Sequence, residues 1–477
     1  MLSVDRRQFL KLGAMGASLA AAGLVGCLKP ARSAKSNVLF IAIDDLNSWI
    51  GCLGHLREGL PVARTPNLDR LAGQGLLFTN AHTPVPWCMP ARNALFVGQY
   101  ANQTGMYIDE RLRDRMPSVQ TLPQHFMQHG YTALASGKLF HDTQREAQSW
   151  HELEIFARPP SQKPRAEKLN QVTGLKAGDT LDWGQIADPE TEFADAKIAD
   201  RTIEHLQSRH NTPFFIAAGF RFPHLPWYLP KTLLDLYPTE SISLPWVKED
   251  DLDDVPEAGR RMAFSSPFGG SLDYTQSDHY LITRSNAWKK AVQAFLAAIT
   301  FADTQLGRVM EALDASPYAE STHVVLWSDN GFHLGEKLHW RKFTLWDQAT
   351  RVPMMIRSAD RRAAGRVVDQ PVSLVDIYPT LVDMCGLSPP AHALSGESLA
   401  AYFASAEHRK TTPAYVTYGK GNDSVVDEQW RFIRYADGTE ELYDHSVDPN
   451  EWTNLAGNQR LQGQRDRLLA LMEAGPR

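Results

Sequence analysis

Four short apolar runs stand out along the chain, and each is followed at once by polar residues. They are too short for helices and are almost continuously apolar, which is the pattern of strands covered on both faces of a parallel sheet. The runs span residues 38–43, 132–135, 214–218 and 324–327. We therefore predict an α/β fold with a large, mostly parallel central sheet flanked by helices.

Helices are predicted between these strands. Apolar residues recur every three or four positions from 286 to 314, which predicts one long amphipathic helix. Thr65 followed by Pro66 is typical of an N-cap with proline at the first helical position. Pro90 is expected to open another helix, with Cys88 just ahead of its N-terminus, where the dipole and free N–H groups favour an anion.

The pattern changes after about residue 400. Short apolar stretches at 414–418, 430–435 and 441–443 predict antiparallel strands, Asp437-Gly438 predicts a hairpin turn, and a terminal helix is expected from about 459. We predict a main domain over residues 36–405 and a small α+β subdomain with a short antiparallel sheet over residues 406–477.

Two stretches have the composition of surface insertions. They span residues 158–180 and 246–277. The second contains the acidic run 249–254, which we expect to be a solvated loop. Because both insertions fall between predicted strand ends, they are also placed to shape a substrate cleft.

Composition narrows the possible functions. The 477 residues carry a net charge of −6 with a pI near 6.2, so no global nucleic-acid-binding surface is expected. The four cysteines, at 27, 52, 88 and 385, do not form a disulfide framework, and Cys52 and Cys385 are expected to be inert.

The N-terminus has the features of an export signal over residues 1–35. The pair Arg6-Arg7, after Asp5 where Ser or Thr is usual, resembles a twin-arginine motif, and an apolar stretch follows. The stretch ends at Cys27 in a lipoprotein-like cleavage site; an uncleaved anchor, or cleavage after Ala34, are the alternatives. We predict export by the twin-arginine machinery to the periplasm, as a free protein or as a lipoprotein anchored at Cys27.

Chemically useful side chains follow each of the four predicted strands. Open α/β sheets bind ligands at the carboxyl ends of their strands, so these side chains are candidates for one site. Carboxylate and amide oxygens suit Ca²⁺ or Mg²⁺, and the scattered cysteines do not suggest zinc. The candidates, in chain order, are Asp44, Asp45, Lys138, His141, His224, Asp329 and Asn330.

Taken singly, these residues have ordinary structural explanations. A lone cysteine such as Cys88 is more often a small buried apolar residue. The Asp44-Asp45 pair is compatible with a helix cap, and His141 and His224 with hydrogen-bonded structural histidines. The argument for chemistry depends on the candidates occurring together.

Cys88 lies in a Cys-x-Pro-x-Arg motif with Arg92, and further motifs surround it in order. Together they resemble the type I formylglycine-dependent sulfatases of the alkaline phosphatase superfamily, and within these the iduronate-2-sulfatase-like enzymes. The resemblance runs from about residue 37 to 454. Its motifs span residues 43–46, 88–92, 137–141, 222–226, 328–336, 340–343 and 442–451.

The resemblance implies a role for each candidate. Asp44, Asp45, Asp329 and Asn330 would ligate one Ca²⁺, completed by Cys88 after its oxidation to formylglycine. Arg92 would hold the formylglycine hydrate. Lys138 and Lys342 would bind sulfate oxygens, His141 would act on the second hydroxyl of the nucleophile, and His224 would protonate the leaving alkoxide.

Two positions depart from the family pattern. Position 91 is alanine where serine is common, and Asn330 stands where animal iduronate sulfatases have a histidine, which weakens an exact transfer of substrate. His333, His339 and Arg341 lie beside the motifs, where substrate contact and a structural role are equally compatible with the sequence.

The resemblance implies a sulfuric ester hydrolase with its catalytic domain at 36–405. We expect it to act on a sulfated carbohydrate, such as a 2-O-sulfated uronic acid, after maturation by a formylglycine-generating enzyme. One alternative is a phosphodiesterase or phosphonate monoester hydrolase of the same superfamily. The other is an inactive glycan-binding surface lipoprotein.

Overall fold

The computed structural model describes residues 35–56, 59–176, 179–264 and 271–476. The export segment up to residue 34, including Cys27, lies outside the described residues, so the predictions made for it stay predictions. The described residues from 35 to 476 form one compact unit. Among the helices described, none is long and apolar enough to cross a membrane.

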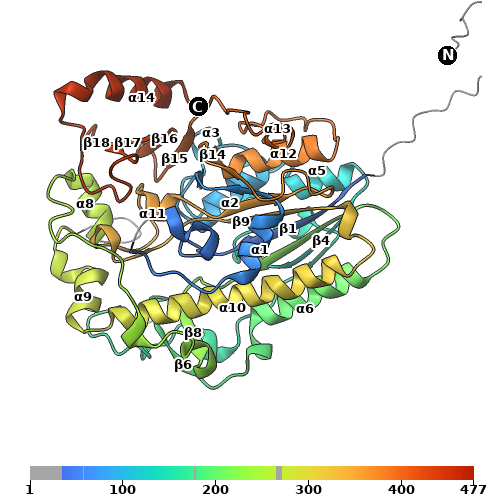
Figure 1. The fold of residues 1–477 in the computed structure, drawn as a ribbon, viewed down its shortest axis with the longest axis horizontal. Coiled ribbons are helices and arrows are strands. Elements are labelled where there is room, and N and C mark those ends of the chain that lie inside the picture. Colours follow the sequence, from blue (N-terminus) through green and yellow to red (C-terminus); the bar gives the residue numbers. More distant parts are fainter. Residues whose placement is uncertain (1–34, 57–58, 177–178, 265–270, 477) are drawn as a thin grey trace, which may run out of the picture. The chain divides into compact units, whose positions relative to one another are not determined.

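An eight-stranded sheet forms the centre of this unit, with the strand order β13-β2-β12-β9-β1-β7-β4-β5 (Figure 1). Only β12 runs against the other strands, because it pairs antiparallel with both neighbours and every other pairing is parallel. The predicted mostly parallel sheet is confirmed. In sheet order the bounds are Arg366–Val368, Leu76–Phe78, Met354–Arg357, Thr322–Ser328, Asn37–Ile43, Phe214–Phe220, Thr132–Gly137 and Glu152–Glu154.

Both faces of the sheet are covered, which explains the continuous apolar runs. In β1, Leu39 and Ile41 belong to one apolar layer, and Phe40 and Ala42 belong to the other. Helices α1, α6 and α10 contribute to the first layer, and α2, α5 and α12 to the second (Figure 1). Their bounds are Pro66–Gln74, Ala194–Gln207 and Trp288–Asp314, then Cys88–Val97, Leu122–Gln128 and Ile377–Met384.

Shorter elements complete this unit. Small strands are β3 (Ala81–His82), β6 (Trp183–Ile186), β8 (Trp227–Pro230), β10 (His333–Leu334), β11 (Trp340–Arg341) and β14 (Val372–Ser373). Short helices are α3 (Ala101–Thr104), α4 (Leu112–Arg115), α7 (Lys231–Leu234), α8 (Glu257–Phe264), α9 (Asp278–Arg284), α11 (Asp347–Thr350) and α13 (Ala401–Ala404).

The predicted helix starts need small corrections. The long helix α10 begins at Trp288, two residues later than expected. Thr65 occupies the N-cap position of α1, but its side chain makes no capping bond; its hydroxyl instead accepts the backbone N–H of Gly51. Helix α2 begins at Cys88, not at Pro90, because the first four N–H groups of a helix have no intrahelical partner and Pro90 loses nothing there.

The C-terminal region forms a four-stranded antiparallel sheet, β15-β16-β17-β18, as predicted in outline. One face of it packs against the terminal helix α14, Gln462–Ala474. Strand β16 was not predicted, because only the last two of its four residues, Val425 and Val426, are apolar. The strands span Ala414–Thr417, Asp423–Val426, Trp430–Arg434 and Glu440–Asp444.

Part of the acidic run 249–254 is buried, so the prediction of a solvated loop was wrong there. Asp251 is 1% exposed, and its carboxylate accepts a hydrogen bond from Lys337 Nζ at 2.8 Å. Leu252 and Val255, which both follow Asp251, pack into an apolar cluster, and helix α8 comes next. Because Leu252 and Val255 are packed in this cluster, the neighbouring carboxylate of Asp251 is buried too, and Lys337 neutralises its charge.

Breaking this buried pair is expected to destabilise the fold. Lys337→Met leaves Asp251 buried without its cation, which typically costs about 3–5 kcal/mol of unfolding free energy. The matched control is Asp250→Ala, since Asp250 lies in the same run with an exposed side chain and should change stability by no more than about 0.5 kcal/mol. Urea unfolding of both variants measures the difference; equal stabilities would contradict a structural role for the pair.

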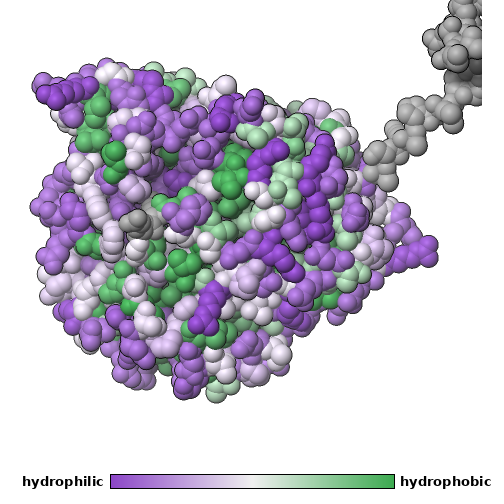
Figure 2. Space-filling model, viewed as in Figure 1, coloured by the Kyte–Doolittle hydropathy of each residue, from purple (hydrophilic) through white to green (hydrophobic). Residues whose placement is uncertain are grey.

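The molecular surface in the view of Figure 2 is mostly hydrophilic, with apolar residues in separate groups. Single exposed apolar side chains are ordinary on folded proteins. Large exposed ones among the described residues include Val62, Ile108, Trp246, Leu272, Val367 and Val447.

Candidate active site

The carboxyl ends of four neighbouring parallel strands meet at one edge of the sheet. Ile43 of β1 lies opposite Phe220 of β7 and Ser328 of β9, and Gly137 of β4 lies opposite Gly219 of β7. The residues that follow these strand ends are therefore neighbours, although up to 285 positions separate them. The structure brings the predicted residues of all four strands together, while their chemical roles stay predictions.

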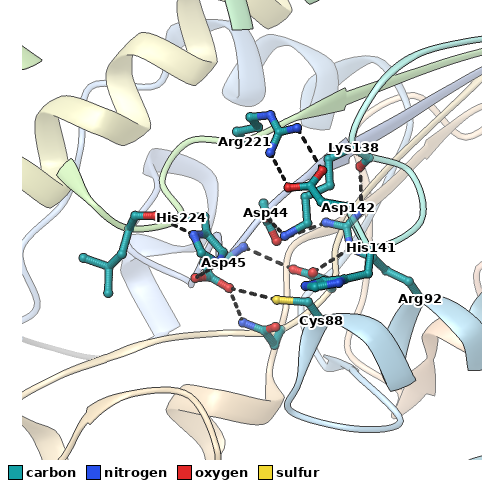
Figure 3. A network of polar contacts seen from close by, with 12 residues as sticks. Asp44, Asp45, Cys88, Arg92, Lys138, His141, Asp142, Arg221 and His224 are labelled. Atoms are coloured by element: carbon teal, nitrogen blue, oxygen red, sulfur yellow. Dashed lines mark hydrogen bonds and ion pairs between the residues drawn. The ribbon is translucent and has the colours of Figure 1, made fainter. Parts of the chain in front are cut away.

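Arg92 of α2 connects three sides of this cluster (Figure 3). Its guanidinium donates to Asp329 Oδ2 at 2.8 Å and to Asp44 Oδ1 at 3.1 Å, and its Nη1 donates to the carbonyls of Lys138 and Leu139 at 2.6 and 2.8 Å. The side chain is fully buried. In the structure Arg92 therefore fixes the carboxylates and the end of β4 relative to the start of α2.

Two lysines neutralise the aspartates. Lys138 Nζ pairs with Asp44, and Lys342 Nζ pairs with Asp45 and lies 2.7 Å from the sulfur of Cys88. Burial raises the pKa of Asp44, but Lys138, His224, Arg92 and Lys342 together bring that pKa well below its ordinary value. Both ammonium groups are thus held beside the cysteine.

Asp329 has a different balance of charges. Burial and the neighbouring carboxylates of Asp44 and Asp45 raise its pKa to about 6, although the Arg92 guanidinium acts in the opposite direction. Three carboxylates packed this closely repel one another, so a further cation between them would stabilise all three.

Cys88 is the first residue of α2 and lies inside the cluster. Its sulfur points to Asp45 Oδ1 at 3.9 Å, and 3% of the residue is exposed. Burial raises the pKa of the thiol well above 9.0, even though Lys138 and Lys342 lower it. A cysteine that attacks as a thiolate needs a lowered pKa, so this environment argues against thiolate chemistry at Cys88.

The donor atoms here fit a hard divalent cation. Carboxylate oxygens of Asp44 and Asp329 and the sulfur of Cys88 all lie within 4.8 Å of one another. Asn330 donates from Nδ2 to Asp45 Oδ1 at 2.8 Å, and its Oδ1 is buried with no hydrogen-bond partner among the described residues. Three carboxylates and one unpartnered amide oxygen are the ligand type that Ca²⁺ prefers.

The two predicted histidines flank the cysteine from different strands. His224 Nδ1 donates to the carbonyl of Leu225 at 2.6 Å, which leaves Nε2 facing Asp45 Oδ2 at 4.0 Å. His141 Nδ1 is hydrogen-bonded to the hydroxyl of Thr143 at 3.0 Å. Burial lowers the pKa of His224 to about 4 and that of His141 to about 3, so both imidazoles are neutral at pH 7 in the free protein.

An ion pair beside His141 was not predicted from the sequence. Arg221 donates two hydrogen bonds to Asp142, at 2.6 and 2.8 Å (Figure 3). Each residue is next to or near a predicted strand end, but nothing in their spacing of 79 positions indicated the pairing. Arg158 was also missed; it donates to the carbonyls of His224 and Leu225 at 3.1 and 2.6 Å and so holds the His224 segment in place.

The three residues left open by the sequence have structural partners. His339 is hydrogen-bonded to the carbonyls of Ala263 and Lys342, and Arg341 binds Asp179 and Asp278. Arg341 also has a φ of 78°, which is unusual for a residue other than glycine. These contacts shape the loop that carries Lys342.

His333 has partners within the same segment. Its two ring nitrogens are hydrogen-bonded to the carbonyl of Glu336 and to the hydroxyl of Thr344. The ring of His333 is fully buried, and its two hydrogen bonds stabilise the loop that carries Lys342.

Comparison with known proteins assigns the family. The profile of the family "Sulfatase" matches residues 36–387. The chain belongs to the sulfatase family. A second profile, "N-sulphoglucosamine sulphohydrolase, C-terminal", matches residues 335–474. The family resemblance found in the sequence is therefore confirmed.

Individual relatives agree with this assignment. A "Sulfatase" of Formosa agariphila is 37% identical over 451 residues, which cover 92% of this chain and 86% of the relative. The "Iduronate 2-sulfatase" of Mus musculus is 29% identical, with 74% of this chain and 69% of the relative covered. The solved phosphonate monoester hydrolase of Silicibacter pomeroyi shares the fold, with a TM-score of 0.74, 21% identity, and 92% and 95% of the two chains covered.

Proposed function

We propose that this sulfatase hydrolyses sulfate esters of a carbohydrate with a formylglycine made from Cys88 and with one bound Ca²⁺. The observation that carries the proposal is the position of the Cys88 sulfur, 2.7 Å from Lys342 Nζ and within reach of the aspartates at the sheet edge. Oxidation of Cys88 would supply a carbonyl whose hydrated form offers a hydroxyl for attack on sulfur.

The charges around Cys88 suit a sulfate ester. Sulfate carries its charge on the non-bridging oxygens, and Lys138 and Lys342 place two ammonium groups beside the sulfur atom of the cysteine. Preorganised cations of this kind stabilise charge in the transition state without reorganising. In the structure these lysines pair with Asp44 and Asp45, whose carboxylates would bind the metal ion.

Asp44, Asp45, Asp329 and Asn330 would hold Ca²⁺, which supplies a Lewis acid for a sulfate oxygen. Their carboxylates and the unpartnered Asn330 Oδ1 support this assignment.

His224 is placed to protonate the leaving oxygen. Its Nδ1 donates to a backbone carbonyl, so Nε2 is the nitrogen left for the substrate, and in the neutral imidazole of the free protein Nε2 carries no proton. The proposed role therefore requires that the negative charge of the bound substrate raise the pKa of His224 and protonate Nε2. The alkoxide of a sugar is a poor leaving group, which makes a general acid necessary. His141, which shares a cavity with Lys138 and His224, would exchange a proton with the hydroxyl that does not attack.

The proposed substrate is a sulfated saccharide, such as a 2-O-sulfated uronic acid. The similarity to iduronate 2-sulfatase supports it, together with the resemblance of residues 43–46 and 137–141 to motifs of the iduronate-2-sulfatase-like enzymes. Export belongs to the same proposal, since polysaccharides are met outside the cytoplasm.

Replacing Arg6 and Arg7 with lysine should keep the protein in the cytoplasm; unchanged export would exclude the twin-arginine route.

The related phosphonate monoester hydrolase fold supports one alternative, an esterase for phosphorus substrates. Rates on 4-nitrophenyl sulfate, phenyl phosphonate esters and phosphate diesters, measured side by side with the matured protein, distinguish the two. We expect the sulfate ester to have the highest kcat/KM. A higher kcat/KM for a phosphorus ester would assign the protein to the hydrolases of phosphorus esters instead. No turnover of any ester would support the alternative of a glycan-binding protein without activity.

A further inference from the structure

A cavity of 420 Å³ adjoins the candidate active site and shares Lys138, His141 and His224 with it. The rest of its wall is rich in positive charge. Asp142 is the single acidic residue among its described lining residues, against five cations: Lys138, Arg145, Arg158, Lys163 and Arg221. A cavity of this charge beside a sulfate-binding site is suited to further anionic groups.

Three of the five cations have their donors occupied within the protein. Lys138 pairs with Asp44, and Arg221 pairs with Asp142. Arg158 donates to two backbone carbonyls and has no carboxylate partner in the described part of the chain. Its charge therefore adds to the potential of the cavity without being neutralised.

The remaining two cations are Arg145 and Lys163. Both are exposed, and across the described ranges neither side chain makes a hydrogen bond or ion pair. They come from separate segments, one after His141 and one after the short turn Pro160–Gln162, and meet at the same cavity. Convergence of two unpaired cations from different loops on one cavity indicates a binding function.

Arg145 is held in place by an unusual backbone. Its φ is 58° and that of Glu146 is 51°, in the left-handed region that non-glycine residues rarely adopt. The preceding Gln144 anchors this turn through Asn93 of α2, with Nε2 2.9 Å from Asn93 Oδ1. Glu146 is buried and pairs with Arg113 at 2.9 Å.

This anchoring ties the arginine to the helix that carries Cys88. Strained backbone that is fixed from both sides often marks a residue whose position serves a function.

We propose that Arg145 and Lys163 form an anion subsite that binds a second negatively charged group of the saccharide, a carboxylate or a further sulfate. The subsite rests on the proposed sulfatase function and adds to it a preference for polyanionic substrates. Arg145 supplies a planar guanidinium that can hold a carboxylate or sulfate through two hydrogen bonds, and Lys163 supplies a point charge. Arg158 contributes a fixed charge to the wall of the same cavity.

The test compares two substrates in the full-length, matured protein. Arg145→Ala/Lys163→Ala should raise KM about tenfold or more for a disaccharide that carries a uronic carboxylate, a 2-O-sulfate and a second sulfate. Its kcat should stay near that of the unaltered protein, as should kcat/KM for 4-nitrophenyl sulfate, which has no second anion. An unchanged KM for the disaccharide, or an equal loss on both substrates, would overturn the subsite.

A matched control and a modified sugar sharpen this test. Lys289→Ala/Lys290→Ala removes two exposed lysines of α10 that do not line the cavity, and should leave KM unchanged. Reducing the uronic carboxylate to an alcohol should raise KM of the unaltered protein to that of the double variant if the carboxylate is the bound group. If KM instead rises only when a second sulfate is removed from the sugar, the sulfate is the bound group.

Failure of the proposed function can be separated from failure of the subsite. If the protein hydrolyses no sulfate ester, the affinity of Cys88→Ala for the disaccharide is measured with and without the two alanine substitutions. A loss of affinity of about tenfold supports the subsite independently of turnover. Equal affinity in both proteins would overturn it.

Discussion

Cys88→Ala is expected to lower kcat on a sulfate ester by about 10⁴-fold or more, because removal of a catalytic nucleophile leaves only binding and charge stabilisation. Cys88→Ser should be nearly as inactive, since a serine side chain has no hydrated aldehyde to break down after the transfer. The measurement is steady-state turnover of 4-nitrophenyl sulfate by protein produced with a maturing enzyme.

Another cysteine provides the control for this prediction. Cys52 is half-buried on the short helix Gly51–Leu56, outside the carboxylate cluster, and Cys52→Ala should retain activity. Circular dichroism of each variant confirms that the fold is intact. A Cys88→Ala protein that keeps a tenth or more of the activity would contradict the role given to this residue.

His224→Ala is expected to affect substrates according to their leaving groups. For a sugar sulfate, loss of the general acid should lower kcat by about 10²–10⁴-fold. For 4-nitrophenyl sulfate the leaving phenolate needs little help, so the loss should be less than about tenfold. The comparison of the two rates in one variant separates proton donation from a general disturbance of the site.

The control for His224→Ala is a histidine outside the cluster. His55 is exposed on the same short helix as Cys52, and His55→Ala should behave as the unaltered protein on both substrates. If His224→Ala instead slows both esters by the same factor, the side chain positions other groups and does not donate the proton.

The parts of the fold that could be predicted were those with a local signature. The strand at 38–43 is visible because six consecutive residues are apolar, and the pair Asp44-Asp45 is visible because it follows directly. The convergence of the residues that follow these strands then rests on the rule that parallel strands present their carboxyl ends at one edge, while the strand order was not predicted. The cysteine motif, together with the motifs that surround it, indicated which chemistry this edge has.

The sequence could not show ion pairs between residues that are far apart in the chain and that loops bring together. Lys337 lies 86 positions from Asp251, and Arg221 lies 79 positions from Asp142. Nothing in the local pattern distinguishes these charges from solvated ones. The unpaired state of Arg145 is equally invisible, because it depends on what the surrounding loops leave unneutralised.

The mass of the peptide containing Cys88, taken from protein produced with a maturing enzyme, tests the central claim most directly. Conversion of the thiol to the aldehyde lowers the mass by about 18 Da, and this shift is the predicted result. Ala91 in the motif is not expected to prevent it. A fully unmodified thiol in protein that turns over sulfate esters would contradict the account, because catalysis would then proceed without the nucleophile assigned to Cys88.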